Sequence, residues 1–215
     1  MTTPGNSQSP IDFCKREITF VNQLPEIQFS YPKRTDVTLE NTGSPDEFRT
    51  VRADVGRGAA FVTLSGARYD LLQFHWHTPS EHEIEGERTR LETHFVHRQV
   101  DDNSLLVIGV LVKTGEENRA IRPIFHNLPK QSGETRDVPE VHLPGLLPRV
   151  RETFRYSGSL TTPQFDEGVQ FIVFTEPISF APQQIGAFQK LFPHGNSREV
   201  QPLNGREVLC DACGM

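Results

Sequence analysis

This sequence of 215 residues has no long apolar run, only three cysteines and no excess of positive charge. Its longest apolar run, LLVIGVLV at 105–112, is far shorter than the roughly 18 residues of a membrane-spanning helix. We therefore expect no membrane segment there, and a strand instead. The formal net charge is −6, whereas proteins that bind nucleic acids regardless of sequence need clustered lysine and arginine. We accordingly expect no nucleic-acid partner.

The few cysteines and the first residues bear on the compartment. Three cysteines cannot all pair with one another, so at least one thiol is free or forms an intermolecular bond. Two of them stand in CDAC at 210–213, within an expected flexible tail at 209–215, and residues 1–5 are expected to be flexible as well. The start MTTPGNSQSPIDF lacks the basic and apolar regions of a secretory leader. A cytoplasmic location is therefore expected, with export and a leader absent from this sequence as the alternative.

Glycine and proline, sixteen of each, interrupt the chain at short intervals and leave apolar runs of strand length. The length fits one domain of the all-β type. We predict a single, mainly β domain over residues 1–215. Strands are expected at 17–22, 60–64, 69–77, 90–100, 105–113 and 169–175, short helices at 118–128 and 182–192, and a long ordered connection at 129–153.

Histidines are concentrated in one part of the chain. Five of the eight lie within 23 residues, in QFHWHTPSEHEI at 73–84 and LETHFVH at 91–97. Successive side chains of a strand point to opposite faces, so Gln73, His75 and His77 share one face. Phe74 and Trp76 then lie on the other face. The first segment therefore offers two imidazoles on one side of a strand.

The second segment adds a third imidazole, because His94 and Glu92 also share a face. If residues 85–86 form a two-residue hairpin turn, antiparallel pairing puts His94 opposite His77. A shift of two residues would put His94 opposite His75 and leave the shared face unchanged. In either register the three imidazoles converge.

Three converging neutral imidazoles match the ligand set of a catalytic zinc site, which leaves a fourth position open. Gln73 and Glu92 each stand two residues before a proposed ligand, where they can accept the ring N–H that does not face the metal. A single histidine of this kind is more often a hydrogen-bonded structural residue. The shared face favours a Zn²⁺ site, and His82 and His97, which fall outside the set, are expected to be structural.

Five segments resemble, in order along the chain, signature segments of the alpha-class carbonic anhydrases: NSQSPID at 6–12, QFHWHTPSEH at 73–82, ETHFVH at 92–97, GSLTTP at 158–163 and VQPLNGR at 200–206. The resemblance implies a central twisted, mostly antiparallel sheet, a few short peripheral helices and zinc at the bottom of a cleft. It also implies reversible hydration of carbon dioxide to bicarbonate and a proton by attack of zinc-bound hydroxide. A homodimer is compatible with these features.

Position by position, the resemblance implies that His75, His77 and His94 hold the zinc. Thr161 resembles the residue whose hydroxyl accepts a hydrogen bond from the zinc-bound hydroxide. Glu81 resembles the carboxylate that accepts the proton of the Thr161 hydroxyl. The remaining matches lie on the substrate side, beside bicarbonate or in the apolar wall that receives carbon dioxide: Thr162, Val96, Val107, Leu160 and Phe171.

The segment at the expected cleft rim departs from the family pattern. A histidine there often carries the proton away, but NTGSPDEFRTV at 41–51 contains none. Ser44 or Arg49 stands in its place, depending on the alignment, and neither titrates near pH 7. We expect proton transfer to limit turnover unless Glu47 or buffer substitutes.

Two other functions are compatible with parts of this pattern. A non-catalytic binding protein on the same fold is one, although such relatives generally lose a zinc-binding histidine and this chain keeps all three. An unrelated zinc hydrolase with the same ligands is another. Metal content and a carbon dioxide hydration assay separate these functions.

Overall fold

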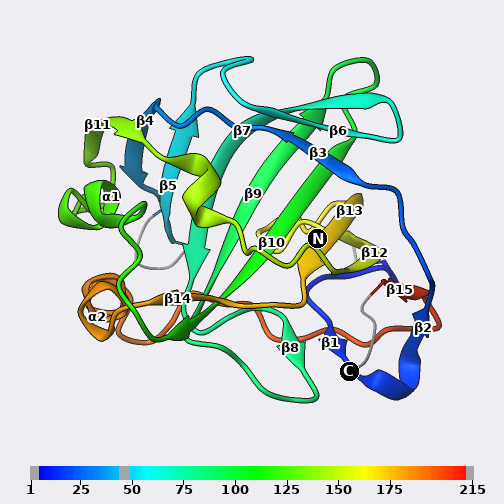
Figure 1. Ribbon diagram of the computed structural model, residues 1–215. Coiled ribbons are helices and arrows are strands. Elements are labelled where there is room, and N and C mark those ends of the chain that lie inside the picture. The colour runs from blue at the N-terminus through cyan, green and yellow to red at the C-terminus, as the bar shows by residue number, and fades with distance from the viewer. Residues whose placement is uncertain (1–4, 44–48, 212–215) are drawn as a thin grey trace.

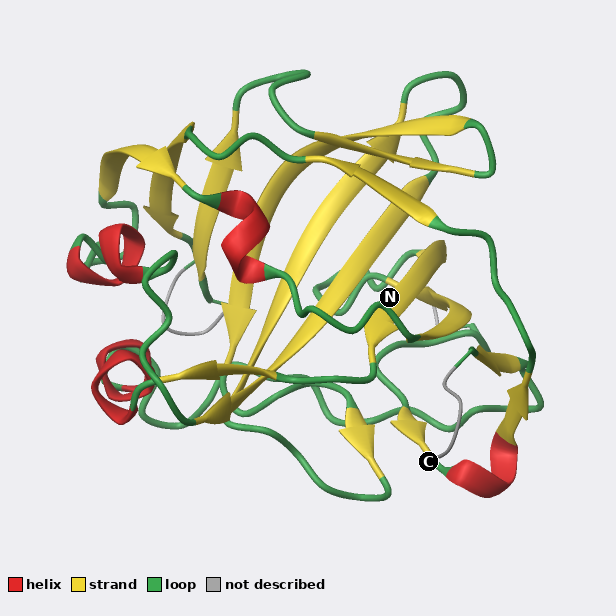
Figure 2. Cartoon of the chain, in the orientation of Figure 1, coloured by secondary structure: helices red, strands yellow, loops and turns green. Residues whose placement is uncertain are grey.

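A computed structural model of the protein describes residues 5–43 and 49–211. Most of its regular structure is strand (Figure 1, Figure 2). The strands are β1 (Asp12–Phe13), β2 (Ile18–Phe20), β3 (Ile27–Ser30), β4 (Thr35–Asn41), β5 (Val51–Val55), β6 (Phe61–Leu64), β7 (Ala67–His77), β8 (Glu83–Ile84), β9 (Leu91–Gln99), β10 (Leu105–Thr114), β11 (Thr135–Val141), β12 (Thr153–Ser159), β13 (Glu167–Phe174), β14 (Ile178–Phe180) and β15 (Val208–Cys210). The helices are α1 (Arg122–His126), α2 (Pro182–Gln189) and two 3-10 helices, η1 (Lys15–Glu17) and η2 (Leu143–Leu146).

One large twisted sheet dominates the described part of the chain. Its main path runs β11-β4-β5-β7-β9-β10-β13-β12-β15-β2, while β3, β6 and β14 pair beside it and β1 pairs with β8 in a separate small sheet. Most neighbours are antiparallel; the parallel pairs are β10 with β13, β10 with β14, β15 with β2, and β1 with β8. The prediction of a mainly β, mostly antiparallel fold with short peripheral helices is therefore confirmed.

Alternation along the strands separates an apolar face of the sheet from a second face. In β5, Val51, Ala53 and Val55 are buried in the main core, and the residues between them are only half-buried. The large rings of β7 lie on the core face, where Trp76 packs edge-on to Phe125 of α1 at a centroid distance of 5.4 Å. The helices therefore cover the core face, and the second face is left to form a site.

The helices are shorter than the sequence predicts. Helix α2 begins at Pro182, whose fixed φ suits the first helical position, and the Ala181 N–H donates to the Gln184 side chain at 3.0 Å. It ends at Gln189, before Pro193, which cannot continue a helix. Among the described residues, no helix is long and apolar enough to cross a membrane. The cytoplasmic location and the homodimer stay predictions.

The sequence analysis missed every strand outside the six predicted ranges, namely β1, β3, β4, β5, β8, β11, β12, β14 and β15. In β4 only Val37 and Leu39 are apolar and they alternate with polar residues, so the strand lacks the continuous apolar run from which the other strands were predicted. Strand β11 lies inside the predicted connection 129–153 and contains Pro139. It pairs only with β4 at the sheet edge, the place where a proline is tolerated in a strand.

The expected flexible tail at 209–215 begins too early. Leu209 and Cys210 belong to β15, which pairs with β12 on one side and β2 on the other. Cys210 is fully buried in the apolar cluster on the second face of the sheet. Residues 1–4 and 212–215, which include Cys213, lie outside the described residues.

His97 is a buried histidine that the fold holds in its neutral form. Its Nδ1 donates to the Leu106 carbonyl oxygen at 3.3 Å, and its Nε2 accepts from the Tyr31 hydroxyl at 2.6 Å. Burial lowers the pKa of His97 from 6.5 to about 4. Its structural role, expected from the sequence, agrees with these contacts.

We expect acid to weaken the fold through His97. Between pH 6.5 and about pH 4 the unfolded state binds this proton and the folded state does not, so this part of the stability is complete above pH 6.5 and is lost as the pH falls. At about 1.36 kcal/mol per pKa unit, the total is about 3 kcal/mol. Urea unfolding measures the free energy of unfolding at pH 7.5 and at pH 5. Between these two values we expect it to fall by about 2 kcal/mol less in His97→Gln than in the parent. The exposed His126→Gln should behave like the parent, and equal losses in all three proteins would contradict this prediction.

Candidate metal centre

The three predicted ligands lie side by side on neighbouring strands. Strands β7 and β9 are antiparallel, and His75 lies directly opposite His94. The ring centroids are 5.0 Å apart for His75 and His77, 5.5 Å for His75 and His94, and 4.8 Å for His77 and His94. One ring nitrogen from each of the three lies within 4.8 Å of the other two. The fold thus brings three buried imidazoles to one point.

The register differs from the simple hairpin count. His94 pairs with His75 rather than with His77, which lies opposite Glu92. The segment between the strands is not a two-residue turn, because it includes the short strand β8 as well as the turn at residues 85–86. The alternative register, shifted by two residues, is therefore the correct one, and the shared face survives as expected.

Two of the imidazoles are oriented through Nδ1. The Nδ1 of His75 donates to Gln73 Oε1 at 2.8 Å, and the Nδ1 of His77 donates to the Asn196 carbonyl oxygen at 3.1 Å. Each ring therefore presents an unprotonated Nε2. The Nε2 of His77 is buried and has no hydrogen-bond partner among the described residues. A buried nitrogen lone pair of this kind is costly unless it has a partner, and a metal ion would be one.

The third imidazole uses its other nitrogen. The Nε2 of His94 donates to Glu92 Oε1 at 2.9 Å, so Nδ1 carries the free lone pair. Gly109 stands opposite His94 on β10, and a methyl group there would lie 2.9 Å from Glu92 Oε1. Because Gly109 has no side chain, it leaves space for the Glu92 carboxylate. Gln73 and Glu92 thus both lie where the sequence analysis expects them, against the ring nitrogen that faces away from the site.

Glu92 is held as a buried carboxylate by several donors. Its Oε1 also accepts from His82 Nδ1 at 2.8 Å, and its Oε2 accepts the backbone N–H groups of Glu81 and His82, each at 2.9 Å. Burial by itself would raise the pKa of Glu92, but His82, His94 and their hydrogen bonds hold it well below its usual value. The Nε2–H of His94 therefore donates to a carboxylate that is held in its ionised form.

Two of the proposed ligands, His75 and His77, are neutral at neutral pH. Burial lowers the pKa of His77 to about 4, and it lowers the pKa of His75 well below its usual value, with the neighbouring His77 and His94 adding to the effect. Metal ligands must be unprotonated, so these imidazoles need not lose a proton before they bind an ion.

Glu81 and Thr161 lie beside the imidazoles. Glu81 is fully buried, with Oε1 accepting the Arg198 backbone N–H at 2.9 Å and Oε2 lying 3.7 Å from His94 Nδ1. Burial raises the pKa of Glu81 to about 7, against the effects of His94, the Arg198 N–H and a hydrogen bond from the Thr161 side chain. Thr161 lowers the pKa of Glu81 as a nearby hydroxyl donor does, while Glu81 Oε2 has no hydrogen-bond partner among the described residues.

The predicted apolar wall forms a row across three strands. Val96 of β9, Val107 of β10 and Phe171 of β13 are opposite one another in register, and all three are buried. The Phe171 ring lies 5.9 Å from the His94 ring, centroid to centroid, and Leu160 packs against the same cluster. This row borders the imidazoles on one side.

For the remaining site residues expected from the sequence, the structure says less about their roles. Thr162 is half-buried, and its carbonyl oxygen accepts from the Phe165 N–H at 2.8 Å, so its role beside bicarbonate stays a prediction. Ser44 and Glu47 lie outside the described residues. Arg49 lies within them; it donates to Asn41 Oδ1 at 3.4 Å and lies over the Phe192 ring.

Sequence reasoning missed the partners that come from distant segments. The Asn196 carbonyl and the Arg198 N–H reach the site from more than 110 positions along the chain. Tyr156 was also missed; its hydroxyl lies 2.6 Å from His82 Nε2 and donates to Ser9 Oγ at 2.9 Å. Backbone groups carry no residue signature, so no feature of the sequence could have identified the first two.

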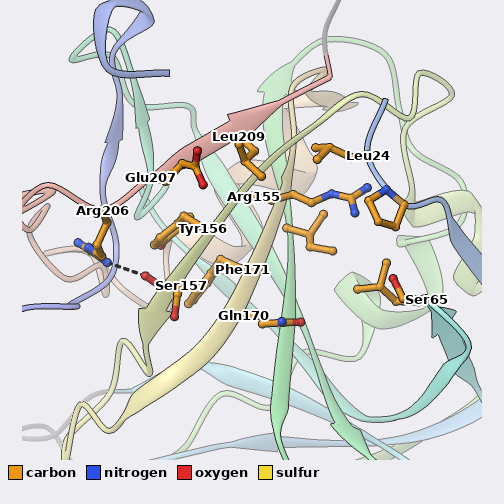
Figure 3. Close-up of a pocket in the computed structure, with 13 residues that line it drawn as sticks. Leu24, Ser65, Arg155, Tyr156, Ser157, Gln170, Phe171, Arg206, Glu207 and Leu209 are labelled. Carbon is orange, nitrogen blue, oxygen red and sulfur yellow. Dashed lines mark hydrogen bonds between the residues drawn. The ribbon is translucent and has the colours of Figure 1, made fainter. Parts of the chain in front are cut away.

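A separate hollow of about 500 Å³ lies along β12 and β13 (Figure 3). Much of its wall comes from Arg155, Ser157, Gln170 and Ile172, which alternate with the residues of the cleft face. At one end Arg206 donates to the Ser157 carbonyl oxygen at 3.0 Å. Tyr156 and Phe171, which belong to the apolar cluster beside the imidazoles, line the hollow as well, so it is not confined to the opposite face of the sheet.

Known proteins resemble this chain over nearly its whole length. A family model described as eukaryotic-type carbonic anhydrase matches residues 1–212. A carbonic anhydrase of Klebsiella pneumoniae is 34% identical over 208 residues, which are 95% of this chain and 80% of the relative. The structure of an alpha-carbonic anhydrase from Thermovibrio ammonificans, in complex with the inhibitor sulfanilamide, has a TM-score of 0.88 at 35% identity and covers 95% of this chain and 87% of that chain.

A second solved structure agrees with the first. The alpha-carbonic anhydrase of Photobacterium profundum has a TM-score of 0.83 at 33% identity, over 95% of this chain and 89% of that chain. Both the length of the match and its identity are well above what a shared fold alone requires. This chain therefore belongs to the eukaryotic-type, alpha-class carbonic anhydrase family.

Proposed function

We propose that this carbonic anhydrase hydrates carbon dioxide reversibly to bicarbonate and a proton at a zinc ion held by His75, His77 and His94. The observation that supports it best is the buried, unpartnered Nε2 of His77, together with the two other imidazole nitrogens within 4.8 Å. Three neutral nitrogen donors with an open fourth position are the donor set of a catalytic zinc site.

A zinc ion bound there would supply hydroxide near neutral pH by lowering the pKa of a water to about 7, an effect for which carbonic anhydrases are themselves the reference case. The surrounding residues favour zinc as well. Gln73, the Asn196 carbonyl and Glu92 hold the three rings by their other nitrogens. Such partners fix which nitrogen is protonated and how each ring is turned.

Thr161 and Glu81 would orient the nucleophile. In its ionised form Glu81 would accept the proton of the Thr161 hydroxyl, and the threonine oxygen would then be left to accept a hydrogen bond from the nucleophile. That bond turns a hydroxide lone pair away from Thr161. The lone pair is then directed toward the side of the cleft where the substrate lies.

The apolar row would hold the uncharged substrate. Carbon dioxide carries no net charge, and Val96, Val107 and Phe171 offer it a dry surface beside the imidazoles. Bicarbonate is charged and gains nothing from such a surface. The wall therefore favours the substrate over the product.

Removing the metal should abolish the activity. After dialysis against a strong chelator we expect the carbon dioxide hydration rate in stopped flow to fall by at least about a thousandfold, since the nucleophile is then ordinary water. Adding one equivalent of zinc should restore the rate, because the imidazoles are oriented by the protein. A parent protein that contains no zinc, or that keeps its full rate without it, would rule out the proposed function.

A further inference from the structure

The second face of the sheet, which carries the imidazoles, has charged residues as well as apolar ones. Arg52 of β5 lies directly opposite His75 in the register, and Glu40 of β4 lies opposite Arg52. The row Glu40–Arg52–His75 therefore continues the line of imidazoles toward the sheet edge. Asp54, two residues beyond Arg52, shares the same face and lies opposite Gln73.

Two carboxylates hold the Arg52 guanidinium. Nη2 lies 2.7 Å from Glu40 Oε2 and 3.0 Å from Asp54 Oδ2, and Nε lies 2.8 Å from Asp54 Oδ1. The three side chains are each only about one third exposed, at 37%, 34% and 41% for Arg52, Glu40 and Asp54. A cation with contacts from two directions has little freedom to move. Arg52 thus places a fixed charge on the second face of the sheet, beside the strand that carries His75.

The charge of Arg52 reaches the proposed metal site. Arg52 and His75 are directly opposite each other on the same face of β5 and β7, and such antiparallel neighbours have Cβ atoms about 4.5–5.5 Å apart. Charges at the low-dielectric wall of a cleft act over longer distances than exposed ones. A monovalent anion bound near His75 would therefore feel Arg52.

We propose that Arg52 is a specificity-determining residue that sets the affinity of the cleft for bicarbonate and other monovalent anions. This inference rests on the proposed function. Glu40 and Asp54 have two effects: they hold the guanidinium in place, and their two negative charges against its single positive charge leave the trio with a net charge of −1. The apolar side of the cleft takes the uncharged substrate, and the charged side governs how tightly the product anion is retained.

The test is thiocyanate binding to the zinc-loaded protein, measured by isothermal titration calorimetry at low ionic strength. Arg52→Gln leaves two carboxylates without their cation, and we expect affinity to fall about threefold to tenfold. Glu40→Gln removes one negative charge and should tighten binding about twofold to threefold. Arg52→Lys keeps the charge and should bind within about twofold of the parent. The matched control is Arg68→Gln, which removes an arginine paired with Asp70 at the far end of β7 and should leave affinity unchanged.

Each outcome has a clear meaning. Equal affinity in Arg52→Gln and the parent overturns the inference, as does the same loss in Arg68→Gln. Zinc content and circular dichroism are measured for each variant; if Arg52→Gln fails to fold, the opposite shift expected for Glu40→Gln decides. If the parent binds thiocyanate equally well with and without zinc, the proposed function itself fails. If the parent binds thiocyanate only with zinc and Arg52→Gln has the same affinity as the parent, only the inference about Arg52 fails.

Discussion

His77→Ala is expected to lose bound zinc and carbon dioxide hydration together. The variant removes one of three nitrogen donors, the one whose lone pair is buried without a partner in the described structure. Removing a residue that hydrogen-bonds to a metal ligand lowers metal affinity by about 10- to 100-fold. Removing a ligand itself should therefore lower the affinity for zinc by more than about a hundredfold. Competition with a chelator of known affinity measures this change, and stopped-flow hydration measures the rate.

His77 is a cleaner choice than His94 for this test. The His94 ring donates to Glu92, so His94→Ala would also strip a partner from a buried carboxylate and weaken the fold. On its far side His77 Nδ1 donates to the Asn196 carbonyl oxygen at 3.1 Å and lies 3.4 Å from Glu81 Oε1, so His77→Ala takes no hydrogen bond from Glu92. The exposed His126→Ala serves as the matched control and should keep zinc and rate. Parental zinc affinity in His77→Ala would exclude this histidine as a ligand.

Thr161→Ala is expected to lower kcat/KM by on the order of a hundredfold while zinc binding stays unchanged. Placed hydrogen-bonding groups of this kind are worth about 10²- to 10³-fold. The alanine variant loses the acceptor that orients the nucleophile, and it leaves the buried Glu81 carboxylate with one donor fewer. Stopped-flow hydration with a parallel zinc determination separates this effect from loss of metal.

Thr161→Ser gives the sharper comparison. Serine keeps a hydroxyl that can donate to Glu81 and accept from the nucleophile, so we expect it to retain activity within about tenfold of the parent. The exposed Thr114 at the end of β10 provides a control, since Thr114→Ala removes a threonine hydroxyl far from Glu81 in the chain. If Thr161→Ser and Thr161→Ala lose activity equally, orientation through the hydroxyl is not the role of Thr161.

The ligand set could be predicted because strand alternation is local. His75 and His77 are two residues apart, so any strand through them places both rings on one face. The same rule places Gln73 and Glu92 beside their ligands. The register between β7 and β9 is not a local property, because it depends on how residues 78–90 connect the two strands. The register counted from a two-residue hairpin turn was wrong by two residues. The prediction that the three histidines share a face still held, because a shift of two residues leaves every side chain on the same face of the sheet.

By itself the sequence determined the face on which each histidine lies, the residue types around it and, through ordered motifs, the family. The tertiary structure decided which nitrogen of each ring is free, because that depends on the Asn196 carbonyl and on Glu92. It also decided that Arg52 lies beside His75, through the pairing of β5 with β7. Contacts between segments distant in the chain depend on sheet pairing, and the spacing of residues along one strand carries no information about the strand that will lie next to it.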